Sequence, residues 1–182
     1  MPKQTNIAIF DLDGTLVETD AANNAAYRIA LSTVTSKKFT SLPMHGRLTA
    51  NAVRKALNLA DDEMWAVVQA KSCAYARELW RTRLGPAAQS LRGILKNRST
   101  YRNVVLLTDG NERRAYETLS FWNMAHCFDK IVCNGGRGDK YANYFESCDS
   151  DPAACVVWEN ETEKIASALA SGVLIENIRK VG

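Results

Sequence analysis

The sequence predicts an α/β fold in which a doubly wound, mainly parallel sheet carries an inserted α-helical cap. Three observations lead to this prediction: three continuous apolar runs that end in polar residues, helical patterns after the second and third runs, and a long helical interval after the first. Continuous apolar runs suit strands that are buried on both faces of a parallel sheet. Strands that alternate with helices favour right-handed crossovers within one sheet.

The first strand is expected over residues 6–10, where a short apolar run leads into polar residues. The pattern over residues 21–84 is helical throughout, and its clearest helix is expected over residues 61–83. Acidic residues occupy the first turn of that helix, basic residues its last turn, and a Gly-Pro pair follows as a stop signal. Helices inserted after the first strand would cover the carboxyl edge of the sheet, where open α/β sheets bind ligands.

The C-terminal half alternates between strands and helices. Asn111 is expected to cap a helix over residues 112–120, and a second helix over residues 161–171 is expected to stop at Gly172. The expected strands of this half, two clear and two weaker, are 104–107, 155–158, 128–133 and 173–175.

These elements divide the chain of 182 residues into a core of residues 1–16 and 89–182 and a helical cap of residues 17–88. The charge is divided in a similar way. Residues 17–102 contain fourteen Lys and Arg against six Asp and Glu, a net charge of +8, whereas the rest of the chain sums to −5. Two units of different electrostatic character are the natural explanation.

The composition excludes several classes of protein. With 46% hydrophobic and 24% charged residues, the chain resembles globular proteins rather than disordered or fibrous ones. Its apolar stretches fall far short of the roughly 18 residues that span a bilayer. Asp11 and Asp13 interrupt the N-terminal apolar run before a signal peptide could form, so we expect a cytoplasmic protein that does not bind membranes. The five cysteines include no C-x-x-C pair, which favours reduced thiols.

Two acidic residues follow the first strand in a pattern that indicates a functional site. Asp11 and Asp13 are two positions apart, so both carboxylates can point to the same side, and Gly14 lets the backbone turn directly afterwards. An Asp after a strand often only caps a turn. Two such residues in the order D-x-D-G-T favour a functional site.

The segment of residues 10–17, FDLDGTLV, resembles the first motif of the haloacid dehalogenase-like superfamily, in its phosphatase and phosphomutase branch. The resemblance extends over nearly the whole chain. It implies a Rossmann-like core, an attack of Asp11 on phosphorus that gives an aspartyl-phosphate, and a general acid and base role for Asp13. A carboxylate is a workable phosphoryl acceptor, and a second carboxyl can protonate the leaving oxygen.

The second and third motifs of the family have counterparts in order along the chain. The strand of residues 104–107 is followed by Thr108, Asp109 and Gly110, which the resemblance implies to be phosphate-binding. Lys140 matches the lysine that offsets charge at the site, although Tyr141 follows where the family usually has proline, and Lys130 is a second lysine nearby.

The fourth motif implies a Mg²⁺ site, with one departure from the family. The chain has Glu159 and then Asn160, where the family usually has Asp in the second position. The resemblance implies Asp11, Asp13, Glu159 and Asn160 as metal residues. Asn160 still offers a carbonyl oxygen, but it lacks the negative charge of an Asp. Glu159 or Glu163 could supply that charge instead.

The cap suggests the class of substrate. Its basic balance favours anions, and Arg47, in a loop-like stretch beside His45, resembles the cap residue that meets the substrate in the family. The resemblance implies a small phosphorylated substrate. No nucleic-acid motif is present, so action on nucleic acid is not expected.

Several alternatives stay open at this point. A phosphomutase would use the same residues, and a catalytically impaired phosphate-binding or regulatory protein is suggested by Asn160. A protein that acts on nucleic-acid 5′ phosphates through the basic cap would bind with a steep salt dependence. A two-component receiver also uses an Asp pair, Thr and Lys, but the helical insertion after the first strand argues against it.

Overall fold

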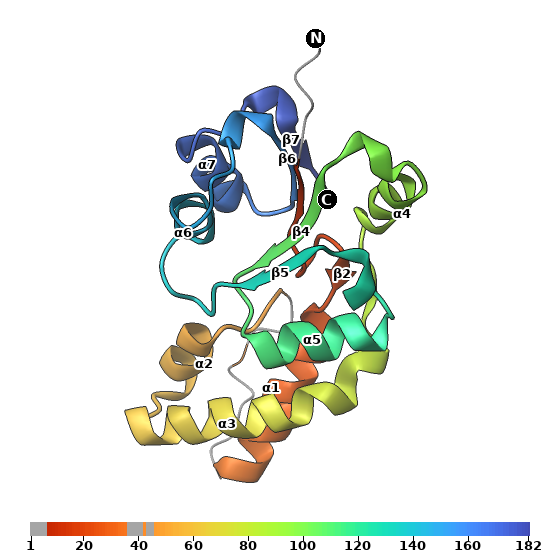
Figure 1. Cartoon of the computed structure of the whole chain (residues 1–182). Coiled ribbons are helices and arrows are strands. Elements are labelled where there is room, and N and C mark those ends of the chain that lie inside the picture. The colour runs from red at the N-terminus through yellow and green to blue at the C-terminus, as the bar shows by residue number, and fades with distance from the viewer. Residues whose placement is uncertain (1–6, 36–41, 43–45) are drawn as a thin grey trace. The chain divides into compact units, whose positions relative to one another are not determined.

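The computed structural model describes residues 7–35, 42 and 46–182 of the chain (Figure 1). Two compact units are present. One consists of the residues up to Glu18 together with Leu84–Gly182, and the other consists of Thr19–Arg83. The sequence-based division lies at residues 16/17 and 88/89, whereas in the structure Leu84 already belongs to the first unit.

The first unit is built on a five-stranded parallel sheet with strand order β5-β4-β1-β6-β7. Its strands are β1 (Ile7–Phe10), β4 (Asn103–Thr108), β5 (Lys130–Cys133), β6 (Cys155–Glu159) and β7 (Ile178–Lys180). β1 lies at the centre, where Ile9 pairs with Val105 of β4 and Val157 of β6. The arrangement confirms the predicted parallel α/β sheet, and it brings the carboxyl ends of β1, β4 and β6 to one edge.

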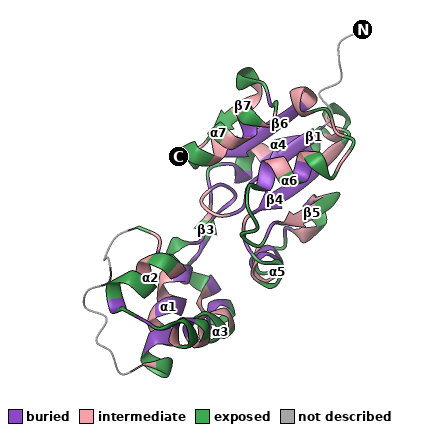
Figure 2. Ribbon diagram, turned by 90° about the vertical axis from the view of Figure 1, so that its left-hand side faces the viewer, coloured by how far each residue is buried: buried purple, intermediate pink, exposed green. Residues whose placement is uncertain are grey.

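Helices cover both faces of the sheet, as expected for a doubly wound fold. α4 (Ala88–Lys96) and α5 (Glu112–Phe121) pack on the face that carries Phe10. α6 (Lys140–Glu146) and α7 (Thr162–Ala170) pack on the face that carries Ile9. Neighbouring residues of β1 therefore contribute to opposite halves of the core. Figure 2 shows β1, β4 and β6 as buried strands within this unit.

The second unit is helical, with α1 (Asp20–Val34), α2 (Ala50–Leu57) and α3 (Asp61–Glu78). Its core includes Tyr27, Leu31, Val53 and Val67. Thr49 caps α2, because its hydroxyl oxygen accepts from the backbone N–H of Ala52 at 3.2 Å. α3 ends at Glu78, five residues before the predicted end, and a 3₁₀ turn over Leu79–Arg81 follows it.

Short elements complete the chain. β2 (Val17–Glu18) and β3 (Arg83–Leu84) form a two-stranded sheet. Further 3₁₀ turns occupy Arg98–Thr100, Ala125–Cys127, Pro152–Ala154 and Ile175–Asn177. In the part of the chain that the structure describes, no helix has both the length and the apolar character that a bilayer crossing requires.

The prediction of a strand over residues 173–175 is wrong. The backbone N–H of Val173 donates to the carbonyl oxygen of Ala168 at 3.1 Å and so closes the end of α7, where Gly172 has a φ of +98°. Val173 is buried beneath this turn, so its apolar side chain fits the end of a helix as well as it would fit a strand. The strand begins five residues later, at Ile178.

Candidate active site

Asp11 lies at the carboxyl edge of the sheet, directly after β1, and is buried. Its backbone N–H donates to the carbonyl oxygen of Trp158 at 3.1 Å, which continues the contact between β1 and β6 beyond the last residue of β1. Lys140 Nζ lies 2.7 Å from Asp11 Oδ1. The structure thus brings together two residues that the sequence analysis selected from opposite ends of the chain.

Lys140 links two carboxylates in the interior of the first unit. It is the first residue of α6, and its side chain is only 2% exposed. Its Nζ atom lies 2.8 Å from Glu159 Oε2 as well as 2.7 Å from Asp11 Oδ1. Lys130, the other lysine considered, is exposed, and its Nζ lies over the ring of Tyr144. Lys140 is therefore the lysine of this site.

The buried charges shift each other's pKa values. Burial raises the pKa of Asp11 to about 6; Lys140 opposes this shift and Glu159 adds to it. Burial alone would lower the pKa of Lys140, but Asp11 and Glu159 outweigh that effect and raise the pKa above its usual range. Lys140 accordingly stays charged across the physiological pH range.

Glu159 has a different set of contacts from the one expected of a metal ligand. Its Oε2 accepts from the hydroxyl of Tyr141 at 3.0 Å and from Lys140, and its Oε1 accepts from the backbone N–H groups of Asn160 and Glu161. Four donors thus satisfy this carboxylate. The structure places Glu159 in contact with Lys140, and its expected role among the metal residues stays a prediction.

Asp13 forms an ion pair that the sequence analysis did not foresee. Its Oδ2 accepts from Nη2 of Arg114, and both side chains are largely buried, at 15% and 13% exposed. Arg114 belongs to the first turn of α5, where the side chain of Asn111 accepts from its backbone N–H at 2.9 Å, as the predicted cap requires. Burial lowers the pKa of Arg114, and the Asp11 carboxylate opposes that shift.

Asn160 packs on the loop that carries the second aspartate. Its Oδ1 accepts from the hydroxyl of Thr15 at 3.1 Å. Gly14 has a φ of +80°, and a Cβ atom built on it would lie only 2.3 Å from Nδ2 of Asn160. The D-x-D-G-T segment therefore needs glycine for both its backbone conformation and its close contact with Asn160.

Gly14→Ala is expected to lower the free energy of unfolding by about 1–3 kcal/mol, because the methyl group meets Asn160 in a conformation that already disfavours alanine. Gly136→Ala is the matched control, since Gly136 also has a positive φ of +72° but has no atom within 4 Å of its built Cβ. Urea denaturation of both variants measures the difference. Equal losses would contradict the packing argument.

The residues expected to bind phosphate follow β4. Thr108 is buried, and its hydroxyl oxygen accepts from the backbone N–H of Gly110 at 3.0 Å. Asp109 forms an ion pair with Lys164 of α7, and its Oδ1 accepts from Nδ2 of Asn134 at 2.8 Å. These contacts account for an acidic residue beside a proposed phosphate site, because Lys164 offsets its charge.

The oxygen donors left for a divalent cation are few but suitable in kind. Within residues 7–35, 42 and 46–182, no three His, Cys, Asp or Glu side chains form a group that could hold a metal ion. Asp11 and Asp13 follow β1 and Asn160 follows β6, so two carboxylates and an amide carbonyl belong to segments that leave neighbouring strands at the carboxyl edge. Mg²⁺ is commonly bound by one or two carboxylates, with water in its other positions. This donor set fits Mg²⁺, with less negative charge than expected.

Arg47 belongs to the helical unit, and the structure describes its contacts there. Its Nη1 donates to Asp20 Oδ1 at 2.8 Å and to the hydroxyl of Thr19 at 3.0 Å. The Arg47 side chain is partly exposed, at 26%. His45, its neighbour in the expected substrate loop, lies outside the described residues.

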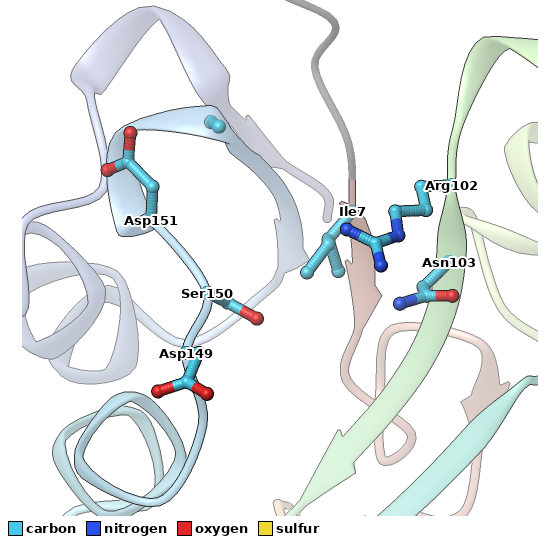
Figure 3. Close-up of a pocket in the computed structure, with 7 residues that line it drawn as sticks. Ile7, Arg102, Asn103, Asp149, Ser150 and Asp151 are labelled. Atoms are coloured by element: carbon cyan, nitrogen blue, oxygen red, sulfur yellow. The ribbon is translucent and has the colours of Figure 1, made fainter.

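A separate cavity lies at the amino end of the strands, away from the residues predicted for catalysis. It has a volume of about 380 Å³, and Figure 3 shows the side chains around it. The lining residues are Ile7, Arg102, Asn103, Asp149, Ser150, Asp151 and Ala154. Because none of them is at the carboxyl edge of the sheet, this cavity is not part of the candidate active site.

Comparisons with known proteins identify the fold. No family model matches the chain, and no curated protein matches its sequence. Solved structures do match. A predicted phosphoglycolate phosphatase from Haemophilus somnus superposes with a TM-score of 0.75 at 17% identity, over 95% of this chain and 84% of that one.

Two further matches are of the same kind. A haloacid dehalogenase-like family hydrolase from Streptococcus pneumoniae gives a TM-score of 0.66 at 19% identity, over 92% of this chain and 81% of that one. A candidate beta-phosphoglucomutase from Thermotoga maritima gives 0.66 at 20% identity, over 96% and 84%. The chain therefore has the haloacid dehalogenase-like fold of phosphatases and phosphomutases.

Proposed function

We propose that this chain is a Mg²⁺-dependent phosphatase that hydrolyses small phosphate monoesters through an aspartyl-phosphate on Asp11. The observation that carries the proposal is the buried Asp11 carboxylate at the edge of the sheet, with Lys140 Nζ at 2.7 Å and Asp13 two residues further on. The likeness to solved hydrolases supports the same reaction class.

The first half of the proposed reaction transfers the phosphoryl group to the protein. Lys140 holds Oδ1 of Asp11, so Oδ2 is the oxygen proposed to attack phosphorus. The bond between phosphorus and the leaving oxygen breaks, and Asp13 gives its proton to that oxygen. Lys140 and the hydroxyl of Thr108 would offset charge that develops on the phosphoryl oxygens.

The second half returns the protein to its starting state. Asp13, now a carboxylate, takes a proton from water, the resulting hydroxide attacks phosphorus, and the bond to Asp11 breaks. Inorganic phosphate leaves and Asp13 is protonated again. In the phosphomutase alternative, a sugar hydroxyl takes the place of water, so the same residues serve both reactions.

Mg²⁺, when bound, would supply positive charge to the transferring phosphoryl oxygens. The residues proposed to hold it are Asp11, Asp13, Glu159 and Asn160, which offer the oxygen donors that this ion prefers. Thr15 positions the Asn160 carbonyl oxygen through its hydroxyl, and Gly14 lets the loop approach the same side chain.

Hydrolysis of an aryl phosphate and of a panel of small phosphorylated metabolites tests the proposed function. The purified protein is expected to release inorganic phosphate from at least one of them when Mg²⁺ is present, and EDTA is expected to suppress the release. A mutase would instead interconvert phosphorylated sugars without net phosphate release. Folded protein with neither activity would contradict the proposal.

The pH dependence of kcat/KM is expected to show an acid limb near pH 6. It is measured at Mg²⁺ concentrations well below saturation, because a bound cation would lower the pKa of Asp11. Asp11 must be ionised to attack, and burial raises the pKa of Asp11 to about 6. Below that pH the rate should fall roughly tenfold per unit, and at higher pH the rate should fall again where Asp13 loses the proton that it gives to the leaving oxygen. Initial rates between pH 3.5 and 9 measure both limbs. A limb near pH 4, where the pKa of an Asp side chain usually lies, would contradict the raised pKa of Asp11.

A non-catalytic phosphate-binding protein is the second candidate. Asn160 in place of an acid, and the ion pair between Asp13 and Arg114, are the observations that favour it. Such a protein would bind inorganic phosphate in calorimetry but would turn over no member of the panel.

A further inference from the structure

Tyr141 is one of the largest fully buried side chains, and no step of the proposed reaction uses it. Its hydroxyl donates to Oε2 of Glu159 at 3.0 Å, and Nζ of Lys140 lies over its ring, 5.2 Å from the ring centroid. These two contacts lead to Lys140, one directly and one through Glu159. Proline, which the family usually has at this position, would offer neither contact.

The first turn of α6 fixes the position of Tyr141. Asp139 caps this helix, because its Oδ1 accepts from the backbone N–H groups of Tyr141 at 2.9 Å and of Ala142 at 3.1 Å. The hydroxyl of Ser167 in α7 donates to the same carboxylate. The cap uses a backbone N–H that proline lacks, so Tyr141 is held at its backbone as well as at its hydroxyl.

Tyr141 and Lys140 donate to the same oxygen of Glu159. Oε2 accepts from the Tyr141 hydroxyl, and it lies 2.8 Å from Nζ of Lys140. Oε1 accepts from two backbone N–H groups, which fix the orientation of the carboxylate. These side chains are buried, so water does not weaken their hydrogen bonds. Because two donors divide the negative charge of Oε2, the hydroxyl limits how far Glu159 draws the ammonium away from Asp11.

We propose that Tyr141 is a positioning residue: its hydroxyl, through Oε2 of Glu159, sets how the Lys140 ammonium is divided between Glu159 and Asp11. The inference rests on the proposed function, in that it takes Asp11 as the nucleophile and Lys140 as its partner. The two carboxylates use two of the three N–H donors of the ammonium, and the third can serve a phosphoryl oxygen. Without the hydroxyl, Glu159 holds the ammonium more tightly and draws it away from Asp11 and from the transferring group.

The Lys140 ammonium can be observed without substrate or metal. Protein labelled with ¹⁵N-lysine is compared by NMR in a metal-free buffer, and the Lys140 signal is assigned by its loss in Lys140→Arg. Tyr141→Phe removes only the hydroxyl and keeps the ring, and it is expected to shift the Lys140 ammonium resonance by more than its line width. The matched control is Tyr144→Phe, which makes the same change at another buried tyrosine of α6. It is expected to leave that resonance in place.

A second background tests the route through Glu159. In Glu159→Gln the neutral amide no longer draws the ammonium, so the added Tyr141→Phe change is expected to shift the Lys140 resonance much less than it does in the wild type. Equal shifts in the two backgrounds would overturn the inference, as would an equal shift in Tyr144→Phe. If Glu159→Gln does not fold, as judged by circular dichroism, the comparison of Tyr141→Phe with Tyr144→Phe decides.

Turnover separates this inference from the proposed function. Tyr141→Phe is expected to lower kcat about tenfold and to leave KM within about twofold, because a displaced Lys140 acts on the transferring group more than on substrate binding. Tyr144→Phe is expected to change neither. Hydrolysis by the wild type with an unaltered kcat in Tyr141→Phe would remove only this inference. Since no turnover enters the NMR comparison, the expected shifts support the link from Tyr141 to Lys140 even if the protein hydrolyses nothing.

Discussion

Asp11→Asn is expected to lower turnover by at least about 10³-fold with every substrate that the wild type hydrolyses, because it removes the proposed nucleophile. An amide oxygen is far less nucleophilic than a carboxylate, and the other carboxylate that contacts Lys140, that of Glu159, already accepts from Tyr141 and two backbone N–H groups. The side chain keeps its size, so the packing around β1 should survive. Steady-state rates with the best substrate of the panel measure the loss.

The control for this variant is Asp149→Asn, which makes the same chemical change at the cavity on the amino side of the sheet. Its turnover is expected to equal that of the wild type. If Asp11→Asn retained more than a tenth of wild-type turnover, Asp11 would not be the nucleophile, and the proposed covalent route would fail with it.

Lys140→Gln is expected to have the second-largest effect, on stability and activity together. The substitution leaves Asp11 and Glu159 buried without the cation that lies within 2.8 Å of both. Loss of one partner of a buried ion pair costs about 3–5 kcal/mol of unfolding free energy. Removal of a donor to the developing phosphoryl charge costs about 10²–10³-fold in turnover.

Two variants separate these effects of Lys140. Lys130→Gln changes the other candidate lysine, which is exposed, and is expected to alter neither stability nor turnover. The double variant Lys140→Gln with Glu159→Gln removes one unpaired charge, so it is expected to recover part of the stability but none of the turnover. Denaturant unfolding and steady-state rates measure the two quantities. A Lys140→Gln variant as stable as the wild type would show that the ion pairs of Lys140 with Asp11 and Glu159 do not stabilise the fold.

Local patterns predicted the sheet because they depend on neighbouring residues. The apolar runs at β1, β4 and β6 and the Asn111 cap of α5 were all confirmed, since burial on both faces and helix capping leave signals within a few positions. The strand at residues 173–175 was misassigned because a buried residue that closes a helix has the same apolar signature as a strand residue.

The site was only partly predictable for a related reason. Asp11 and Asp13 stand in a recognisable pattern, but the partners of Glu159 and Arg114 lie far away in the sequence, at Lys140 and Asp13. The one available signal for Arg114 was its place in the first turn of a helix at the same sheet edge as the aspartates. A basic residue is unfavourable near the positive N-terminal end of a helix, so its presence there indicates that an acidic side chain lies nearby.

Detection of the phosphorylated protein tests the central claim most directly. The wild type, mixed with its best substrate in the presence of Mg²⁺ and quenched in acid within milliseconds, is expected to gain the mass of one phosphoryl group. Peptide mapping should locate that group on Asp11, and alkali should remove it, as expected for an acyl phosphate. A wild type that turns over substrate at full rate but never carries phosphate on Asp11 would contradict the account.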